Sequence, residues 1–154
     1  MMIEARDLFE AHLAVTDLDD AIRFYRDIVG LRLAHVAAAR AAFFWIGPAG
    51  HAMLGLWAAG PAAPNAMSHT AFRATLADVL AAPSALRAAG VTPLDFDGRP
   101  GREPVVLAWM PAAAVYFRDP DGNLLEYIAM LSDEPRPDRG VVTWGVWQAE
   151  TNGR

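Results

Sequence analysis

The first hydrophobic pattern in the chain is an alternation of apolar and polar residues over positions 8–16. A period of two predicts a strand with one buried face, and it places Glu10 and His12 together on the opposite face. A helix is predicted to follow, because Asp17 is a favourable N-cap residue and the apolar residues after it recur at helical spacing until Gly30. The chain is thus expected to begin with a strand and an amphipathic helix.

Three short apolar runs come next and predict three strands, with a turn rich in glycine and proline between the last two. The runs occupy about 31–37, 41–46 and 51–57. The first module therefore spans about 8–57 and has the order strand, helix, strand, strand, strand (βαβββ). A connector rich in alanine, glycine and proline is predicted at 58–66.

The same order of elements begins again after the connector. A strand over 67–75 carries His69. A helix is predicted over 76–89, and Pro83 is expected to break or kink it. We expect the stretch 97–111 to be an insertion that acts as a lid or a rim element. Three further strands are predicted near 91–96, 114–118 and 123–131.

The two modules predict an α+β fold and a single domain over residues 1–131, with the second module at about 67–131. Residues 132–154 are predicted to form a C-terminal extension that contains a strand-like apolar tail. Trp144 and Trp147 lie in this tail, and two large apolar side chains are rarely left in water. We therefore expect the tail to pack on its own sheet or on a partner subunit.

Composition narrows the class of function. An apolar content of 54% in 154 residues is ample for one core. The net charge of −5 offers no general attraction to nucleic acid or anionic lipid. No apolar run approaches the roughly 20 residues that span a bilayer, and residues 1–7 carry charges where a signal peptide would be apolar. We therefore expect a cytoplasmic protein that binds neither nucleic acid nor membrane.

The internal repeat directs attention to two histidines and one glutamate. His12 and His69 lie in the first strands of the two modules, and Glu126 lies in the last strand of the second, at equal intervals. Each has a structural alternative, because the histidines can be solvent-facing or hydrogen-bonded and the glutamate can face water on an edge strand. A carboxylate buried in the apolar run around Glu126 would be costly unless it is paired or metal-bound.

Four short motifs occur in order along the chain and together resemble a known family. They are residues 12–18, residues 24–27 with Gly30 and Leu31, residues 68–72, and residues 116–126. The motifs are similar to those of the vicinal-oxygen-chelate superfamily, which includes glyoxalase I, fosfomycin-resistance proteins, extradiol dioxygenases and bleomycin-binding proteins. The resemblance covers roughly residues 8–131. It implies two βαβββ modules that form a cupped sheet around a metal ion, completed within one chain or across a homodimer.

The resemblance implies that His12, His69 and Glu126 are the metal ligands. Two imidazoles and one carboxylate suit Zn(II), Mn(II), Ni(II) or Fe(II), and three protein ligands leave positions open for substrate oxygens. Since the chain has no cysteine, histidines and carboxylates are its strong ligands. Glyoxalase I takes a further carboxylate from the last strand of the first module, whereas residues 52–57 offer none. The fosfomycin enzymes continue after the metal glutamate with a polar segment, whereas residues 127–131 are apolar.

Three functions are compatible with these residues. The first is a metal-dependent lyase, isomerase or transferase that acts on a small oxygen-rich molecule by Lewis-acid catalysis without a redox change. The second is an Fe(II) extradiol dioxygenase. The third is a non-enzymatic drug-binding protein, against which the complete ligand set argues. For the first, Glu10 is the nearest candidate base, and Glu126 would serve as a base only by leaving the metal.

Several other side chains are candidates for contacts with the substrate. The aromatic candidates for a substrate pocket are Trp45, Trp57, Trp109 and Tyr116, for which a place in the core is the alternative. Arg40, Arg73 and Arg118 are candidates for binding a substrate carboxylate or phosphonate. The paired modules and the apolar tail together predict a homodimer.

Overall fold

A computed structural model describes residues 8, 10–59 and 69–151, and the predicted connector lies almost entirely outside these residues. The chain divides into two compact units. Unit 1 contains the described residues up to position 59 together with the turn Asp119–Asn123, and unit 2 contains residues 69–118 and 124–151.

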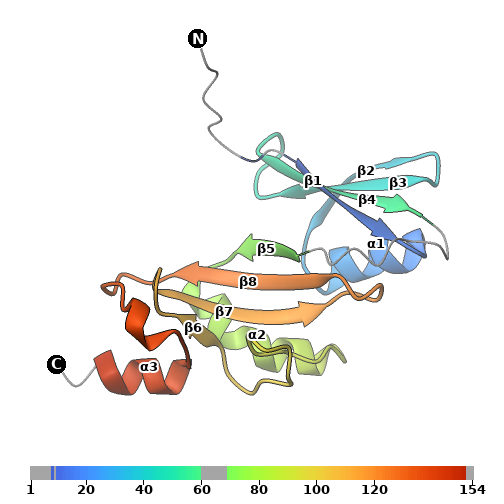
Figure 1. Cartoon of the computed structure of the whole chain (residues 1–154). Coiled ribbons are helices and arrows are strands. Elements are labelled where there is room, and N and C mark those ends of the chain that lie inside the picture. Colours follow the sequence, from blue (N-terminus) through green and yellow to red (C-terminus); the bar gives the residue numbers. More distant parts are fainter. Residues whose placement is uncertain (1–7, 9, 60–68, 152–154) are drawn as a thin grey trace, which may run out of the picture. The chain divides into compact units, whose positions relative to one another are not determined.

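Unit 1 has the predicted βαβββ order. Its elements are β1 (Glu10–Val15), α1 (Leu18–Asp27), β2 (Arg32–Ala37), β3 (Ala41–Ile46) and β4 (Ala52–Ala58). The sheet has the strand order β1-β4-β3-β2, in which β1 runs parallel to β4 and the other pairs are antiparallel (Figure 1). The prediction for this half of the chain is therefore confirmed, with boundaries shifted by one or two residues.

The helix α1 covers one face of the sheet of unit 1. It begins where the Asp17 carboxylate accepts a hydrogen bond from the amide of Asp20 at 2.9 Å, as expected of an N-cap. Its buried residues Phe24 and Tyr25 pack against the side of the sheet that carries Leu13 and other buried apolar residues. Among the described residues of unit 1, no helix covers the opposite face of the sheet, which carries His12.

Unit 2 repeats the βαβββ order and adds a fifth strand. Its first elements are β5 (His69–Arg73), α2 (Leu76–Ala88), β6 (Val105–Leu107), β7 (Ala112–Arg118) and β8 (Leu124–Met130). A single turn of 3-10 helix, η2 (Pro137–Arg139), leads to β9 (Val141–Thr143) and α3 (Trp144–Thr151). The strand order is β5-β8-β7-β6-β9, so the first four strands repeat the arrangement of unit 1 (Figure 1). The predicted α+β fold of two βαβββ modules is confirmed.

Pro83 does not break α2, contrary to one sequence-based expectation. The helix continues through this residue from Leu76 to Ala88. A proline removes one backbone hydrogen bond, that to the carbonyl of Val79. Pro83, Val79 and Leu86 are all buried in the layer between helix and sheet. Tertiary burial therefore outweighs the local penalty of the proline.

The second strand of unit 2 does not lie at 91–96, where the sequence predicts it. Leu94 forms only isolated bridges, to Pro100 and Tyr116, and the strand is β6. Part of the predicted lid, 97–111, is therefore a fully buried strand. The reason is local, because a proline precedes Leu94 and a glycine with φ of 78° at position 98 turns the chain back, whereas β6 is a short run of branched apolar residues.

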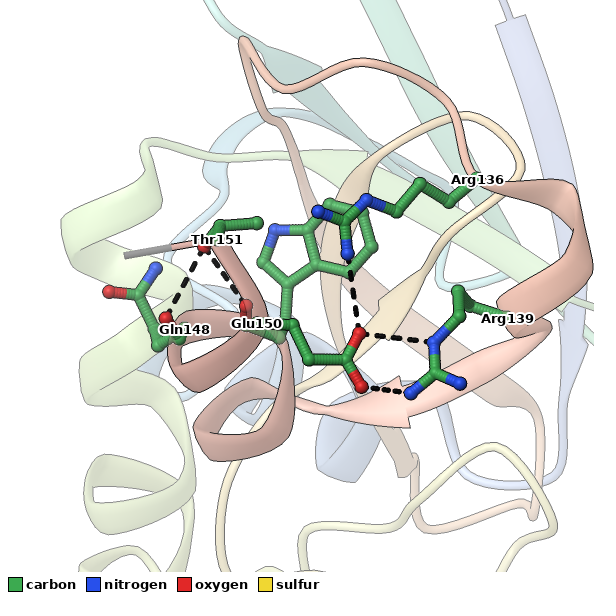
Figure 2. A network of polar contacts seen from close by, with 6 residues as sticks. Arg136, Arg139, Gln148, Glu150 and Thr151 are labelled. Carbon is green, nitrogen blue, oxygen red and sulfur yellow. Dashed lines mark hydrogen bonds and ion pairs between the residues drawn. The ribbon is translucent and has the colours of Figure 1, made fainter. Parts of the chain in front are cut away.

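The C-terminal tail packs on its own sheet, which is one of the two alternatives expected. The strand β9 pairs antiparallel with β6. The predicted strand ends early, however, because α3 begins at Trp144, where the carboxylate of Glu103 accepts a hydrogen bond from the amide of Gly145 at 2.8 Å. Trp147 is fully buried within its own chain. Figure 2 shows Glu150 of α3 held by Arg136 and Arg139, which ties the helix to the segment before β9.

The turn between β2 and β3 is strained, and a glycine is expected to relieve the strain. Ala38 and Ala39 have φ values of 46° and 53°, a left-handed region that side chains with a Cβ disfavour by about 1–2 kcal/mol per residue. We expect Ala39→Gly to raise the free energy of unfolding by about 0.5–1 kcal/mol. Urea unfolding measures this change. Ala49→Gly, in a turn where alanine has no positive φ, is the control and should not be stabilising; equal gains in both variants would contradict the argument.

Candidate functional site

The face of the unit 2 sheet opposite α2 carries the candidate ligands of the second module. Residues opposite each other in a ladder point to the same face, so the register of β5, β8 and β7 places His69, Glu126 and Tyr116 together. The helix α2 covers the other face (Figure 1). His69 stands at the first position of β5, and Tyr116 pairs directly with Glu126.

His69 and Glu126 are in direct contact. Nε2 of His69 lies 2.8 Å from Oε2 of Glu126. The imidazole is about half exposed, with 47% of its side-chain surface accessible, whereas the glutamate side chain is only 4% exposed. The rings of His69 and Tyr116 have centroids 6.0 Å apart. The pair thus joins an accessible nitrogen donor to a buried carboxylate.

The environment of Glu126 opposes its negative charge. Burial raises the pKa of this carboxyl above its ordinary value, and contacts with His69 and Tyr116 oppose this shift without cancelling it. The pKa of the Tyr116 phenol is also raised, by burial and by the neighbouring charge of Glu126. A neighbouring positive charge would therefore stabilise the ionised form of Glu126 at this buried position.

One oxygen of Glu126 has no partner. Oε1 is buried and accepts no hydrogen bond from any described residue. A buried carboxylate oxygen without a donor costs about 1–3 kcal/mol or more, and a cation would satisfy it. An imidazole nitrogen and a carboxylate on adjacent strands also form a donor set typical of borderline divalent cations. The residues of unit 2 therefore fit a metal ion.

Unit 1 holds a second histidine–carboxylate pair. Nε2 of His12 lies 2.9 Å from Oε1 of Glu10 on the same strand, and both side chains are partly exposed. The rings of Phe43 and Trp57 flank the imidazole, with centroids 6.2 and 5.7 Å away. A Cβ added to Gly55 would lie 2.6 Å from Cδ2 of His12, so the imidazole occupies space that only a glycine leaves free.

The two units can be compared position by position. His12 pairs with Gly55 in the parallel ladder of unit 1, as His69 pairs with Leu124 in unit 2. Two residues further along, the partner on β8 is Glu126 and the partner on β4 is Trp57. Unit 1 therefore has an indole at the position where unit 2 has a buried carboxylate.

The complete set of three predicted ligands is divided between the units. His69 and Glu126 belong to unit 2, and His12 belongs to unit 1. Among the described residues, no three histidine, aspartate or glutamate side chains form a cluster that could hold a metal ion. The three-ligand site therefore stays a prediction. The structure shows two of its three residues, His69 and Glu126, in contact.

The predicted aromatic pocket residues lie in different surroundings. Trp45 is half-buried and Trp57 is 43% exposed, and both share with His12 the face of the unit 1 sheet opposite α1. Tyr116 is almost fully buried beside Glu126. Trp109 is 60% exposed in the turn between β6 and β7, at the end of β7 opposite to Tyr116.

A pocket of about 270 Å³ adjoins the His69–Glu126 pair within unit 2. His69 and Tyr116 form part of its wall, together with Arg118, which the sequence indicated as a candidate substrate contact. Phe96, Asp97 and Leu124 also line the pocket, and the sequence did not indicate them as substrate contacts. Phe96 was missed because it lies in a segment predicted to be a strand.

Asp119 is a second residue whose role the sequence did not reveal. It is buried in unit 1 and accepts hydrogen bonds from the hydroxyl of Tyr25 at 2.9 Å and from the amides of Asp121 and Asn123. The sequence predicts a turn here from its Asp-Pro-Asp-Gly composition, but not the long-range contact with Tyr25. Asp119 is therefore a structural residue that fixes the β7–β8 turn.

All three tyrosines of the chain are expected to titrate late. Burial raises the pKa of Tyr127 to about 12 and raises those of Tyr25 and Tyr116 further. Because the folded values lie above the unfolded value of about 10, the neutral phenols stabilise the fold fully below about pH 10, and this contribution is lost as the pH rises through the folded values. The ultraviolet absorbance of tyrosinate should be nearly absent from the folded protein at about pH 11 and present in urea.

In this titration, Tyr127→Phe should remove the earliest step and leave the later ones. Substantial tyrosinate absorbance from the folded protein near about pH 10, where an exposed phenol titrates, would contradict the burial of these side chains.

The architecture defines a class of small α+β proteins built from two βαβββ repeats. Residues 8–127 match the family model of the Glyoxalase/Bleomycin resistance protein/Dioxygenase superfamily, and the chain belongs to this superfamily. None of the curated proteins matches the sequence.

Solved structures support the assignment of the fold. An integron cassette protein from the mobile metagenome of a Halifax Harbour sewage outfall is 28% identical, with a TM-score of 0.69 over 82% of this chain and 100% of that one. A lactoylglutathione lyase from Agrobacterium tumefaciens is 26% identical, with a TM-score of 0.61 over 80% of this chain and 93% of that one. A glyoxalase/dioxygenase from Nostoc punctiforme, 20% identical with a TM-score of 0.64 over 86% and 99%, shares the fold.

No helix among the described residues is long and apolar enough to cross a membrane.

Proposed function

We propose that this chain is a metal-dependent enzyme of the glyoxalase-like type, a lyase, isomerase or transferase that acts on a small oxygen-rich molecule without a redox change. His12, His69 and Glu126 are the proposed ligands of one divalent cation, Zn(II), Mn(II), Ni(II) or Fe(II). The observation that carries the proposal is the buried carboxylate of Glu126, in contact with His69 and with its Oε1 left without a hydrogen-bond partner among the described residues.

The chemistry of the donor atoms supports this function. A bound divalent cation would supply Lewis-acid polarisation of the substrate oxygens. His69 and Glu126 would hold the cation from two adjacent strands of unit 2. In unit 1, the strand paired with that of His12 has Gly55 and Trp57 at the corresponding positions, so it offers no further carboxylate ligand. The lactoylglutathione lyase to which the chain is similar is a lyase by name, which favours this reaction class over the others.

Glu10 is the proposed base. Its carboxylate is partly exposed and lies 2.9 Å from Nε2 of His12, so binding of a cation by that nitrogen would release Glu10 to accept a proton from the substrate. Glu126 is a poorer base, because it is almost fully buried and is needed as a ligand.

A homodimer is proposed as the assembly. Trp147 gives no support for a dimer, because this side chain is fully buried within its own chain. Support comes from large apolar side chains that stay exposed in the described residues, notably Trp57, Trp109 and Met130 at 43%, 60% and 57%. Sedimentation at micromolar concentration should show twice the mass of 16.6 kDa, and a purely monomeric species would count against the dimer.

The reaction class is tested with defined metals in the absence of oxygen. Protein stripped with a chelator is reloaded with Zn(II), Mg(II) or Fe(II) and assayed with thiol-adduct and catechol substrates. Activity with redox-inert Zn(II) under anaerobic conditions is the expected result. Strict dependence on Fe(II) and oxygen would overturn it in favour of an extradiol dioxygenase, and tight ligand binding without turnover under any condition would favour a drug-binding protein.

A further inference from the structure

Unit 2 differs from unit 1 in the segment that joins its helix to its second strand. In unit 1 only a few residues separate α1 from β2, whereas unit 2 inserts a long segment that includes residues 94–101, here called the 94–101 loop. The amide of Asp95 donates to the carbonyl of Arg99 at 2.8 Å, and Oδ1 of Asp95 accepts from the amides of Asp97 and Arg99 at 2.9 Å each. The loop is therefore held in one conformation by its own hydrogen bonds.

The loop holds a phenylalanine in an exposed position beside the candidate metal ligands. Phe96 is 56% exposed. Its ring packs edge-to-face on Tyr116, with centroids 6.2 Å apart at 73°. Tyr116 in turn lies 6.0 Å from the ring of His69. The three rings form a continuous series from the loop to the imidazole.

These rings line the 270 Å³ pocket of unit 2. Leu124 completes its apolar part, and Asp97 and Arg118 add charged groups. Pockets for drug-sized ligands measure about 300–1,000 Å³, so this one suits a compact molecule of about one ring with its substituents. A flat ring placed in this pocket would cover the exposed apolar surface of Phe96.

We propose that Phe96 and Tyr116 form the wall that selects the substrate, and that the substrate carries an aromatic ring next to its metal-binding oxygens. The inference rests on the proposed function of the His69–Glu126 pair, because that pair fixes where the oxygens bind. Phe96 is the specificity-determining residue. It contacts the part of the substrate that does not react, whereas Tyr116 also packs against the ligand Glu126.

A matched pair of chelating probes tests the wall. Benzohydroxamate and cyclohexanecarbohydroxamate present the same two oxygens on a six-membered ring, which is flat and aromatic in the first and saturated and puckered in the second. We expect the zinc-loaded protein to bind the aromatic probe about tenfold more tightly in calorimetric titrations, the size of effect typical of aromatic pairs. Phe96→Leu should reduce this preference to about twofold or less while the zinc content stays unchanged.

Leu80→Ala is the control, since it also removes an exposed apolar side chain but lies on α2, which covers the other face of the sheet. Its ring preference should equal that of the unchanged protein. Equal affinity for the two probes, or a preference that survives Phe96→Leu, would overturn the inference.

If the proposed metal-dependent function is wrong, the binding results differ from those above. The protein then retains no zinc, or zinc leaves the affinity of both probes unchanged. The ring preference is then measured on the metal-free protein by nuclear magnetic resonance. Selective shifts of the amides of Phe96 and Asp97 with benzohydroxamate support the wall, and equal shifts with both probes overturn it.

Discussion

Glu126→Gln is expected to weaken zinc binding by at least about 100-fold, since even residues that only support a metal ligand are worth about 10–100-fold in affinity. The amide keeps the shape of the side chain but removes the charge that a divalent cation requires. The half-exposed His69 would remain, and a single neutral imidazole on this face of unit 2 is a poor site by itself.

The same substitution is expected to leave the metal-free protein at least as stable at neutral pH. Burial raises the folded pKa of Glu126 above its ordinary value. A raised pKa means that the carboxyl contributes stability in its protonated form at acidic pH and loses that contribution as the pH rises through the folded pKa. A neutral amide avoids this loss. Glu126→Gln should therefore be neutral or stabilising at pH 7 and lose any advantage near pH 4.

Thermal unfolding with and without zinc measures both effects. Free zinc at about 100 times its Kd should stabilise the unchanged protein by about 2.7 kcal/mol, which corresponds to roughly 5–10 °C in Tm for a chain of this size. Glu126→Gln should show almost no zinc-dependent shift at the same concentration. His12→Ala and His69→Ala should behave similarly, whereas His51→Ala, in an exposed turn, should keep the full shift. A full shift in Glu126→Gln, or its loss in His51→Ala, would refute the assignment of the ligands.

Trp147→Ala is expected to lower the free energy of unfolding by about 3–5 kcal/mol, the usual cost of removing a large buried aromatic side chain. Trp147 is fully buried among residues of β6, β9 and α3. The guanidinium of Arg136 lies over its ring at 5.2 Å, and Arg136 also contacts Glu150. The cavity would lie beneath the strand that closes the edge of the sheet, so β9 and α3 are expected to loosen together.

Two further variants distinguish packing from other effects in urea unfolding. The indole nitrogen of Trp147 has no hydrogen-bond partner among the described residues, so Trp147→Phe should cost less than half as much as the alanine variant. Val146→Ala, at an exposed position of the same helix, should be nearly neutral. If Trp147→Ala costs less than about 1 kcal/mol, the tail is not part of the core of unit 2.

Local patterns in the sequence determined most of the elements. The alternation over 8–16 predicts both the strand β1 and the face on which His12 lies, because strand side chains alternate strictly. Asp17 caps α1 as its type and position predict. The repeated βαβββ order follows from the same two periods and is confirmed in both units. These features depend on residues within a few positions of one another, so the sequence is sufficient for them.

The tertiary structure determined the features that depend on contacts between residues far apart in the sequence. Burial against the sheet carries α2 through Pro83, and pairing with β6 and cover for Trp147 turn the predicted tail strand into β9 followed by α3. The same distinction between local and long-range features applies to the candidate site. Sequence reasoning predicted His69 and Glu126 as ligands, but their contact, the unpartnered Oε1 and the exposed Phe96 depend on strand register and loop folding. Such properties arise from packing between segments far apart in the chain, which local patterns do not encode.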